Sequence, residues 1–268
     1  MSAANAFRAL LLYAVCASSQ ADAAPEGDAE LIALVADPYL TYEEVLTGFG
    51  ELEDALAERG DARVVFAAVY RTITEDAVAG IDDGYFDNPE WTSAFLLAFA
   101  NLYREAFLDY ESGRLDEVPE AWQVAFDAAK TDGVSVFQHA LLGIHAHINR
   151  DFPYAIAEVT PPEDRAKRYP DYLATNRFLL TTIQDVEELL GTIYDPDLGA
   201  LDDALAGFDE SLLAAVLTQW RLRAWRTAAL FDGSRPPWVE RAATTALNRI
   251  TGQRAHLILG GSRQSLQR

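Results

Sequence analysis

Apolar residues recur at spacings of three and four along most of the chain after Asp37. This spacing matches one face of an α-helix, and Gly or Pro separates the periodic segments, so the pattern predicts stacked amphipathic helices. Short β-branched runs occur, but each continues into a helical period, and no Asn-Gly or Asp-Gly turn joins two alternating runs. We therefore predict an all-α fold, a single-domain multi-helix bundle, with helices over residues 42–59, 62–79, 90–111, 119–130, 134–151, 172–194, 210–231 and 237–259.

Several local signals mark where these helices begin and end. Asn88 supplies a capping side chain, and Pro89 follows it at the first helical position. The prolines and mixed charges of residues 160–170 predict a loop. Glycines are expected to end helices at positions 60, 80, 113, 133, 191, 233 and 260.

Three of the four histidines lie in the predicted helix 134–151. Residues four apart share a helix face, so His147 lies beside Asp151. For the same reason His145 lies beside Asn149, on the opposite side, and one metal ion cannot easily take all four side chains. Between the pairs runs an apolar stripe that is expected to face the core, formed by Phe137, Leu141, Ile144 and Ile148.

Two further residues shape the expected surroundings of Asp151. Pro153 restricts the residue before it, which predicts that Phe152 leaves the helix and that Asp151 falls in the last helical turn. A carboxylate there faces the negative end of the helix dipole, so a metal, protonated His147 or a nearby arginine (Arg150, Arg165 or Arg168) is expected against it. Gly143 lies one turn before His147 and allows a ligand or another helix to approach closely.

The first residues of the chain are typical of an export signal. Arg8 precedes an apolar run, and Ala21-Asp22-Ala23 matches an A-x-A cleavage pattern. Residues 1–23 are therefore predicted to be a signal peptide and residues 24–268 a single all-α domain. The protein would be secreted or periplasmic if the signal is real and cytoplasmic otherwise. Cleavage would remove Cys16, the only cysteine, and leave neither a disulfide nor a thiolate nucleophile.

Charge and hydropathy limit the partners of the chain. The formal net charge is −21, from 42 acidic and 21 basic residues. Such a surface repels phosphate backbones, so no broad nucleic-acid binding is expected, and the acidity also fits a high-salt habitat. No apolar stretch after Ala17 has the length of a membrane span, so no transmembrane segment is predicted in the mature chain.

The stretch 143–153 resembles a bacterial family of helical proteins known only as a domain of unknown function, whose hallmark is similar to N-A-H-I-N-x-D-L-P. His147, Asn149 and Asp151 match this hallmark, whereas His145 replaces an Asn and Phe152 replaces a Leu. The resemblance extends over about residues 45–259 and includes Phe99-Ala100-Asn101-Leu102-Tyr103, Asp171-Tyr172 and Asn176. It implies an all-α fold and supplies no activity.

A local similarity connects the same helix with the zinc-dependent phospholipase C and S1/P1 nuclease group, whose signature has H-x-x-x-D followed by Pro. That group carries a further His six residues beyond the Asp, where this chain has Ala157, with Glu158 next to it. Four histidines are too few for a three-zinc site of that type. A site for one or two metals would take Glu158, Asp171 or Asp87 as an extra ligand.

Two function classes follow from these residues. In the first, a metal-dependent hydrolase, His147 and Asp151 hold Zn²⁺ or another divalent ion that activates water for attack on a small-molecule or ester substrate. Asn149 or Glu158 would then orient the substrate or the metal ligands. In the second, a non-catalytic helical binding or structural module, the same pair is a buried polar clamp. Haem binding through a histidine is a third alternative, and the sequence does not indicate an oligomeric state.

Overall fold

The computed structural model describes residues 27–189 and 210–265, and every regular element in these ranges is a helix. The all-α prediction is confirmed. The elements are α2 (Ala29–Leu34), α3 (Tyr42–Glu58), α4 (Val64–Asp82), α5 (Pro89–Glu111), α6 (Glu120–Ala128), α7 (Val136–Ala146), the π-helical turn η1 (His147–Asp151), α8 (Phe152–Val159), the 3₁₀ turn η2 (Pro162–Asp164), α9 (Arg165–Leu189), α11 (Glu210–Ala228) and α12 (Pro237–Ser265). The predicted signal peptide lies outside the described residues. Among the helices that are described, none has the length and apolar character needed to cross a membrane.

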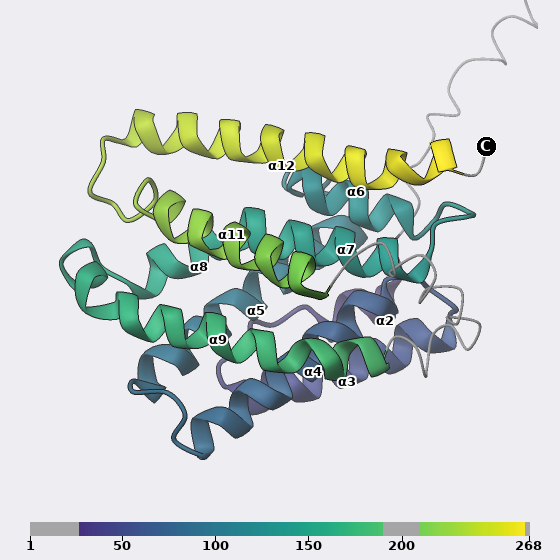
Figure 1. Ribbon diagram of the computed structural model, residues 1–268. Coiled ribbons are helices and arrows are strands. Elements are labelled where there is room, and N and C mark those ends of the chain that lie inside the picture. Colours follow the sequence, from purple (N-terminus) through teal and green to yellow (C-terminus); the bar gives the residue numbers. More distant parts are fainter. Residues whose placement is uncertain (1–26, 190–209, 266–268) are drawn as a thin grey trace, which may run out of the picture.

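The helices pack in layers around one central helix (Figure 1). This central helix consists of α7, η1 and α8, which continue one another without a break from residue 136 to residue 159. On one side it packs against α12, the outermost layer, and against α11; on the other side it packs against α4 and α5. The central helix is therefore covered from both directions.

The described helix ends agree with most of the local signals. The Asn88 side chain accepts a hydrogen bond from the Trp91 N–H at 2.9 Å, and Pro89 is the first residue of α5. Gly60 and Gly113 follow the ends of α3 and α5 with a positive φ, and Gly133 and Gly233 adopt a positive φ in the loops that follow α6 and α11. Gly80 and Gly260 were wrong as stops, since they lie inside α4 and α12, and Gly191 lies outside the described residues. A Cβ on Gly80 would come within 2.8 Å of Phe178, so this glycine allows α9 to approach.

The loop predicted over residues 160–170 is wrong. Only residues 160 and 161 are non-helical, and α9 begins at Arg165 with Pro170 inside it. Tertiary contacts hold this first part of α9 on α11. The Arg165 guanidinium lies 4.7 Å from the Trp225 ring, and Tyr172 stacks on the same ring at 4.6 Å. These contacts outweigh the one backbone hydrogen bond that a proline removes.

Candidate functional site

The central helix changes its hydrogen-bond register at the residues of interest. The Phe152 N–H donates to the carbonyl of His147, five residues back, and this makes the segment from His147 to Asp151 a π-helical turn. Phe152 stays helical, with φ −53° and ψ −41°. The prediction that Pro153 ends the helix was therefore wrong. Proline is tolerated here because it stands at the start of α8, where the wider π-turn has already shifted the pairing.

Asp151 consequently lies in the middle of a long helix, not in its last turn, and its side chain is completely buried. Three donors surround the carboxylate. Trp122 Nε1 donates to Oδ2 at 2.8 Å, His147 Nδ1 lies 3.0 Å from Oδ2, and an Arg150 guanidinium nitrogen donates to Oδ1 at 3.2 Å. His147 and Arg150 were among the expected partners, whereas Trp122 was not.

The His147 ring is enclosed by aromatic side chains, and only 3% of its side chain is exposed. Phe99 stacks on it with the ring centroids 3.4 Å apart and the planes 15° apart. Four more rings meet it from the other sides, with centroid distances from 4.9 to 6.5 Å: Phe66, Tyr70, Tyr103 and Trp122. Nε2 of His147 has no hydrogen-bond partner among the described residues. The ring is thus oriented by Asp151 and shielded from solvent by these side chains.

Burial lowers the pKa of His147 below its ordinary value, although the hydrogen bond and charge of Asp151 oppose this. The folded state therefore favours the neutral ring, with the proton on Nδ1 directed at Asp151. An Asp–His pair with a free Nε2 is the arrangement of a general base. Such a base needs access to a substrate, and the five aromatic rings deny that access.

The same burial effect predicts how stability depends on pH. The pKa values of His139, His145 and His147 are all lowered from 6.5, in each case mainly by burial. As the pH falls through about 6.5, these histidines become protonated in the unfolded chain while they stay neutral in the folded chain. We therefore expect the free energy of unfolding to be highest above that pH and to decrease below it. Urea unfolding at about pH 7.5 and about pH 5.5 measures this, and His147→Gln is expected to make the decline shallower. Equal free energies of unfolding at both pH values would contradict it.

The second pair, His145 and Asn149, lies on the opposite side of the helix from His147 and Asp151, as predicted. There it faces α12. The Asn149 side-chain amide donates to Nδ1 of His145 at 3.1 Å, so Nε2 carries the proton and donates to the Thr251 carbonyl at 2.9 Å. His145 is completely buried. The pair therefore ties the central helix to α12.

Further polar contacts continue along the same seam. Pairing runs antiparallel, so that early residues of the central helix meet late residues of α12. The contacts are Gln138 with the Ile258 carbonyl at 3.2 Å, Arg150 with Asn248 at 3.4 Å and Tyr154 with Thr244 at 3.1 Å. The apolar stripe was expected to face the core. Ile148 is buried and Ile144 packs against the core, whereas Phe137 and Leu141 are half-buried, and the polar pairs are buried more deeply than these.

The remaining candidate residues do not gather around His147. Glu158 is exposed on α8, and Asn149 is bonded to His145. Asp87 is exposed, and Asp171 pairs with Arg168 at 3.3 Å. In the part of the chain that the structure describes, no three His, Cys, Asp or Glu side chains form a group that could hold a metal ion. His147 and Asp151 are the two candidate ligands that lie together, and they are hydrogen-bonded to each other.

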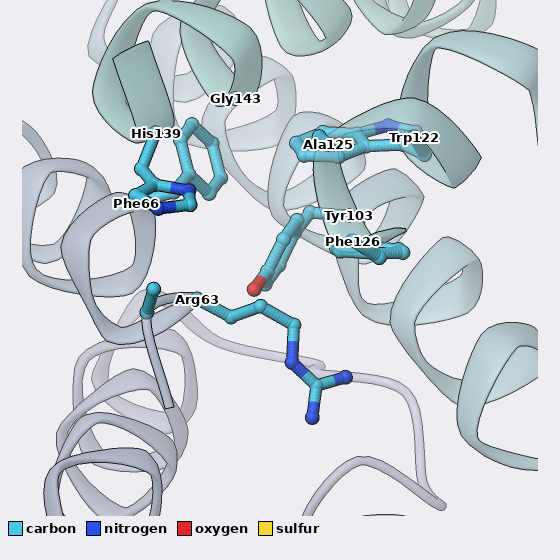
Figure 2. A pocket seen from close by; sticks show the side chains of 9 residues that line it. Arg63, Phe66, Tyr103, Trp122, Ala125, Phe126, His139 and Gly143 are labelled. Carbon is cyan, nitrogen blue, oxygen red and sulfur yellow. The ribbon is translucent and has the colours of Figure 1, made fainter. Parts of the chain in front are cut away.

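A narrow crevice lies between α4, α5, α6 and α7, next to the rings around His147 (Figure 2). The hydroxyl of Tyr103 points into it and has no partner among the described residues. Arg63 borders the crevice, but its guanidinium is bonded to Asp61 and Glu111. The cavity volume is about 20 Å³, room for about one water molecule. His147 is not among the residues that line the crevice and is separated from it by Phe66, Tyr103 and Trp122.

Gly143 allows the close helix contact that its position predicted. A Cβ on this residue would lie 2.3 Å from the Phe66 ring. The glycine therefore lets Phe66 of α4 approach the central helix and cover one side of the His147 ring. It is a neighbouring helix, not a ligand, that uses this space. Trp122 has no comparable signal in the sequence, because nothing in a nine-residue helix 29 positions before Asp151 marks one tryptophan as its donor.

No curated protein and no solved structure matches this chain. One family model matches residues 42–261, which is most of the chain and contains the central helix and most of α12. The family resemblance seen in the sequence is thereby confirmed, and the chain belongs to DUF5995, a family of unknown function.

Proposed function

We propose that this protein is a non-catalytic helical module in which His147, Asp151 and Trp122 form a buried polar clamp. The observation that carries the proposal is the carboxylate of Asp151, which is 0% exposed and has its donors within the protein core. A buried carboxylate is costly unless it is paired and hydrogen-bonded, and here both conditions are met. The clamp joins α6 to the central helix.

The two polar pairs support this proposal together. His147 and Asp151 fasten the central helix to Trp122 on one side, and His145 and Asn149 fasten it to α12 on the other. Buried polar contacts of this kind specify one register, because a shifted helix would leave donors and acceptors unsatisfied. Such a scaffold holds its outer helices in fixed positions, which is what a binding module requires.

Asn101 and Asn176 lie in the other sequence segments that resemble the family, and their side chains also form hydrogen bonds between distant segments. The Asn101 side chain bonds both backbone groups of Tyr39, at 2.9 Å each. Asn176 accepts a hydrogen bond from the buried guanidinium of Arg221 on α11. Each side chain therefore joins segments far apart in the sequence, as expected of structural ties.

The metal-dependent hydrolase is the second candidate, and one observation favours it. Nε2 of His147 is an unpartnered imidazole nitrogen, the atom type that Zn²⁺ prefers. In that case His147 and Asp151 would hold the ion, which would activate water for attack on an ester or another small substrate. Because Asp151 now lies at Nδ1 and Nε2 points away from it, the ring would have to become accessible and rotate before both residues could hold one ion.

One pair of measurements separates the two candidates. Wild-type protein purified without chelator is compared with His147→Ala by elemental analysis and by urea unfolding. The clamp predicts no stoichiometric metal in either protein and a loss of about 2–4 kcal/mol of unfolding free energy in the variant, from the cavity and from the loss of one of the three donors to the buried carboxylate. His139→Ala, in the same helix but outside the clamp, is the control and should lose much less. One metal ion per chain, lost in His147→Ala, would instead establish the hydrolase site.

A further inference from the structure

The charges of this acidic protein are distributed very unevenly. Residues 211–268 hold nine arginines and no lysine against Asp232 and Glu240, a formal charge of +7. The preceding 210 residues hold 12 basic and 40 acidic side chains, a formal charge of −28. The positive charge therefore belongs to the helices α11 and α12, which form one side of the molecule (Figure 1).

The arginines of this side lack the partners that arginines have elsewhere in the protein. Seven arginines of the segment 27–182 form ion pairs with carboxylates, at Arg59, Arg63, Arg71, Arg104, Arg114, Arg150 and Arg168. Exposed Arg241 and Arg249 on α12 form no ion pair with any described residue. Two more cations even lie close together, since the charge of Arg223 adds to burial in lowering the pKa of Arg254. The charge on this side is left uncompensated.

Large apolar side chains are exposed on the same helix. Trp238 is 66% exposed, Ile250 45% and Leu257 74%. Trp238 and Leu257 lie 19 residues apart, so the apolar positions extend over about 28 Å at 1.5 Å per residue. At about 100° per residue, Trp238, Arg249 and Leu257 lie within about 100° of one another around α12, and Arg241 lies next to Trp238 at the edge of this arc. We call this exposed side, with Trp238, Arg241, Arg249 and Leu257, the α12 face. Ile250 points to the opposite side from Arg241 and is not part of it.

We propose that the α12 face binds the surface of an anionic lipid bilayer, with Arg241 and Arg249 at lipid phosphates and Trp238 and Leu257 in the interfacial layer. Arginine pairs well with phosphate, and tryptophan favours the boundary between water and hydrocarbon. An exposed helix is convex and fits a flat surface, whereas a peptide ligand needs a groove or a sheet edge. The geometry thus favours a bilayer over a peptide.

Two other occupants fit this face less well. A second copy docked through the same face would bring Arg241 and Arg249 of both copies together, which like-charge repulsion opposes. A nucleic acid would pair its phosphates with the arginines but offers no interfacial layer for exposed Trp238 and Leu257. A bilayer meets only the outermost layer, α12, and at physiological salt the acidic charges beyond the Debye length of about 8 Å are largely screened. This surface is independent of the polar clamp, so its test does not depend on the proposed function.

The test is sedimentation of the full-length protein with vesicles of phosphatidylcholine alone or of an equal mixture of phosphatidylcholine and phosphatidylglycerol. We expect binding to the mixed vesicles only, and weaker binding at high salt. The double variant Arg241→Gln/Arg249→Gln should bind at least tenfold more weakly, because each basic residue near an anionic surface contributes about 1 kcal/mol. The control Lys167→Gln/Arg177→Gln removes the same charge from exposed positions of α9 and should bind like wild type.

Trp238→Ala tests the apolar part of the surface and should weaken binding without altering net charge. Circular dichroism of each variant checks that the helices persist. No binding of wild type to the mixed vesicles would overturn the proposal, and so would an equal loss in the α12 and α9 double variants. Retention on DNA or heparin without vesicle binding would also overturn it and point to a soluble polyanion.

Discussion

Asp151→Ala is expected to lower the free energy of unfolding by about 2–6 kcal/mol, because two buried donors lose their acceptor. The variant leaves the Trp122 Nε1–H and the His147 Nδ1–H without an acceptor in the core. Each unsatisfied buried donor costs about 1–3 kcal/mol. Since domains of this kind have total stabilities of about 5–15 kcal/mol, the loss is a large part of the whole. Urea unfolding followed by far-ultraviolet circular dichroism measures it.

Two further variants make this prediction specific. Asp151→Asn keeps a side-chain oxygen that can still accept from Trp122, so its loss should be smaller, and it remains measurable should Asp151→Ala fail to fold. Asp109→Ala removes a carboxylate that pairs with Arg114 at 2.6 Å near the surface, where the expected loss is below about 1 kcal/mol. Similar losses for Asp109→Ala and Asp151→Ala would show that burial of Asp151 does not increase its contribution to the free energy of unfolding.

Gly143→Ala is expected to destabilise the protein by about 1–3 kcal/mol through overpacking. The added Cβ would lie 2.3 Å from the Phe66 ring and 2.9 Å from the Phe66 Cβ. The Phe66 Cβ is fixed by the backbone of α4, so the contact cannot be relieved by rotating the ring alone. Separating α4 from α7 would also open the enclosure of His147, because Phe66 forms one wall of it. Thermal or urea unfolding of the variant gives the value.

Gly50→Ala is the matched control for this variant. Gly50 is also inside a helix, but the nearest atom to its added Cβ is the end of the Arg71 side chain, at 4.0 Å. Alanine favours a helix over glycine by up to about 1 kcal/mol, so Gly50→Ala should be neutral or stabilising. A Gly143→Ala variant as stable as Gly50→Ala would mean that the close approach of α4 is not required.

Several properties of this protein follow from local sequence alone. Spacing of apolar residues predicted the helical fold, and Asn88 with Pro89 predicted the start of α5. The spacing of four also predicted that His147 meets Asp151 and that His145 meets Asn149, because residues four apart on a helix are neighbours whatever surrounds them. These features depend on residues close in the chain, which is why a single sequence reveals them.

Other properties were decided only when distant segments packed together. The local signals predicted helix ends at Pro153 and Gly80. Instead η1 leads without a break into α8, which contains Pro153, and Phe178 of α9 packs beside Gly80 inside α4. Trp122 became the donor to Asp151 because the fold brings α6 to η1. The most buried side of the central helix was likewise set by its neighbours on both sides, which cover the polar pairs. Periodicity along one chain records which residues share a face, whereas burial and partner identity depend on the packing of several helices.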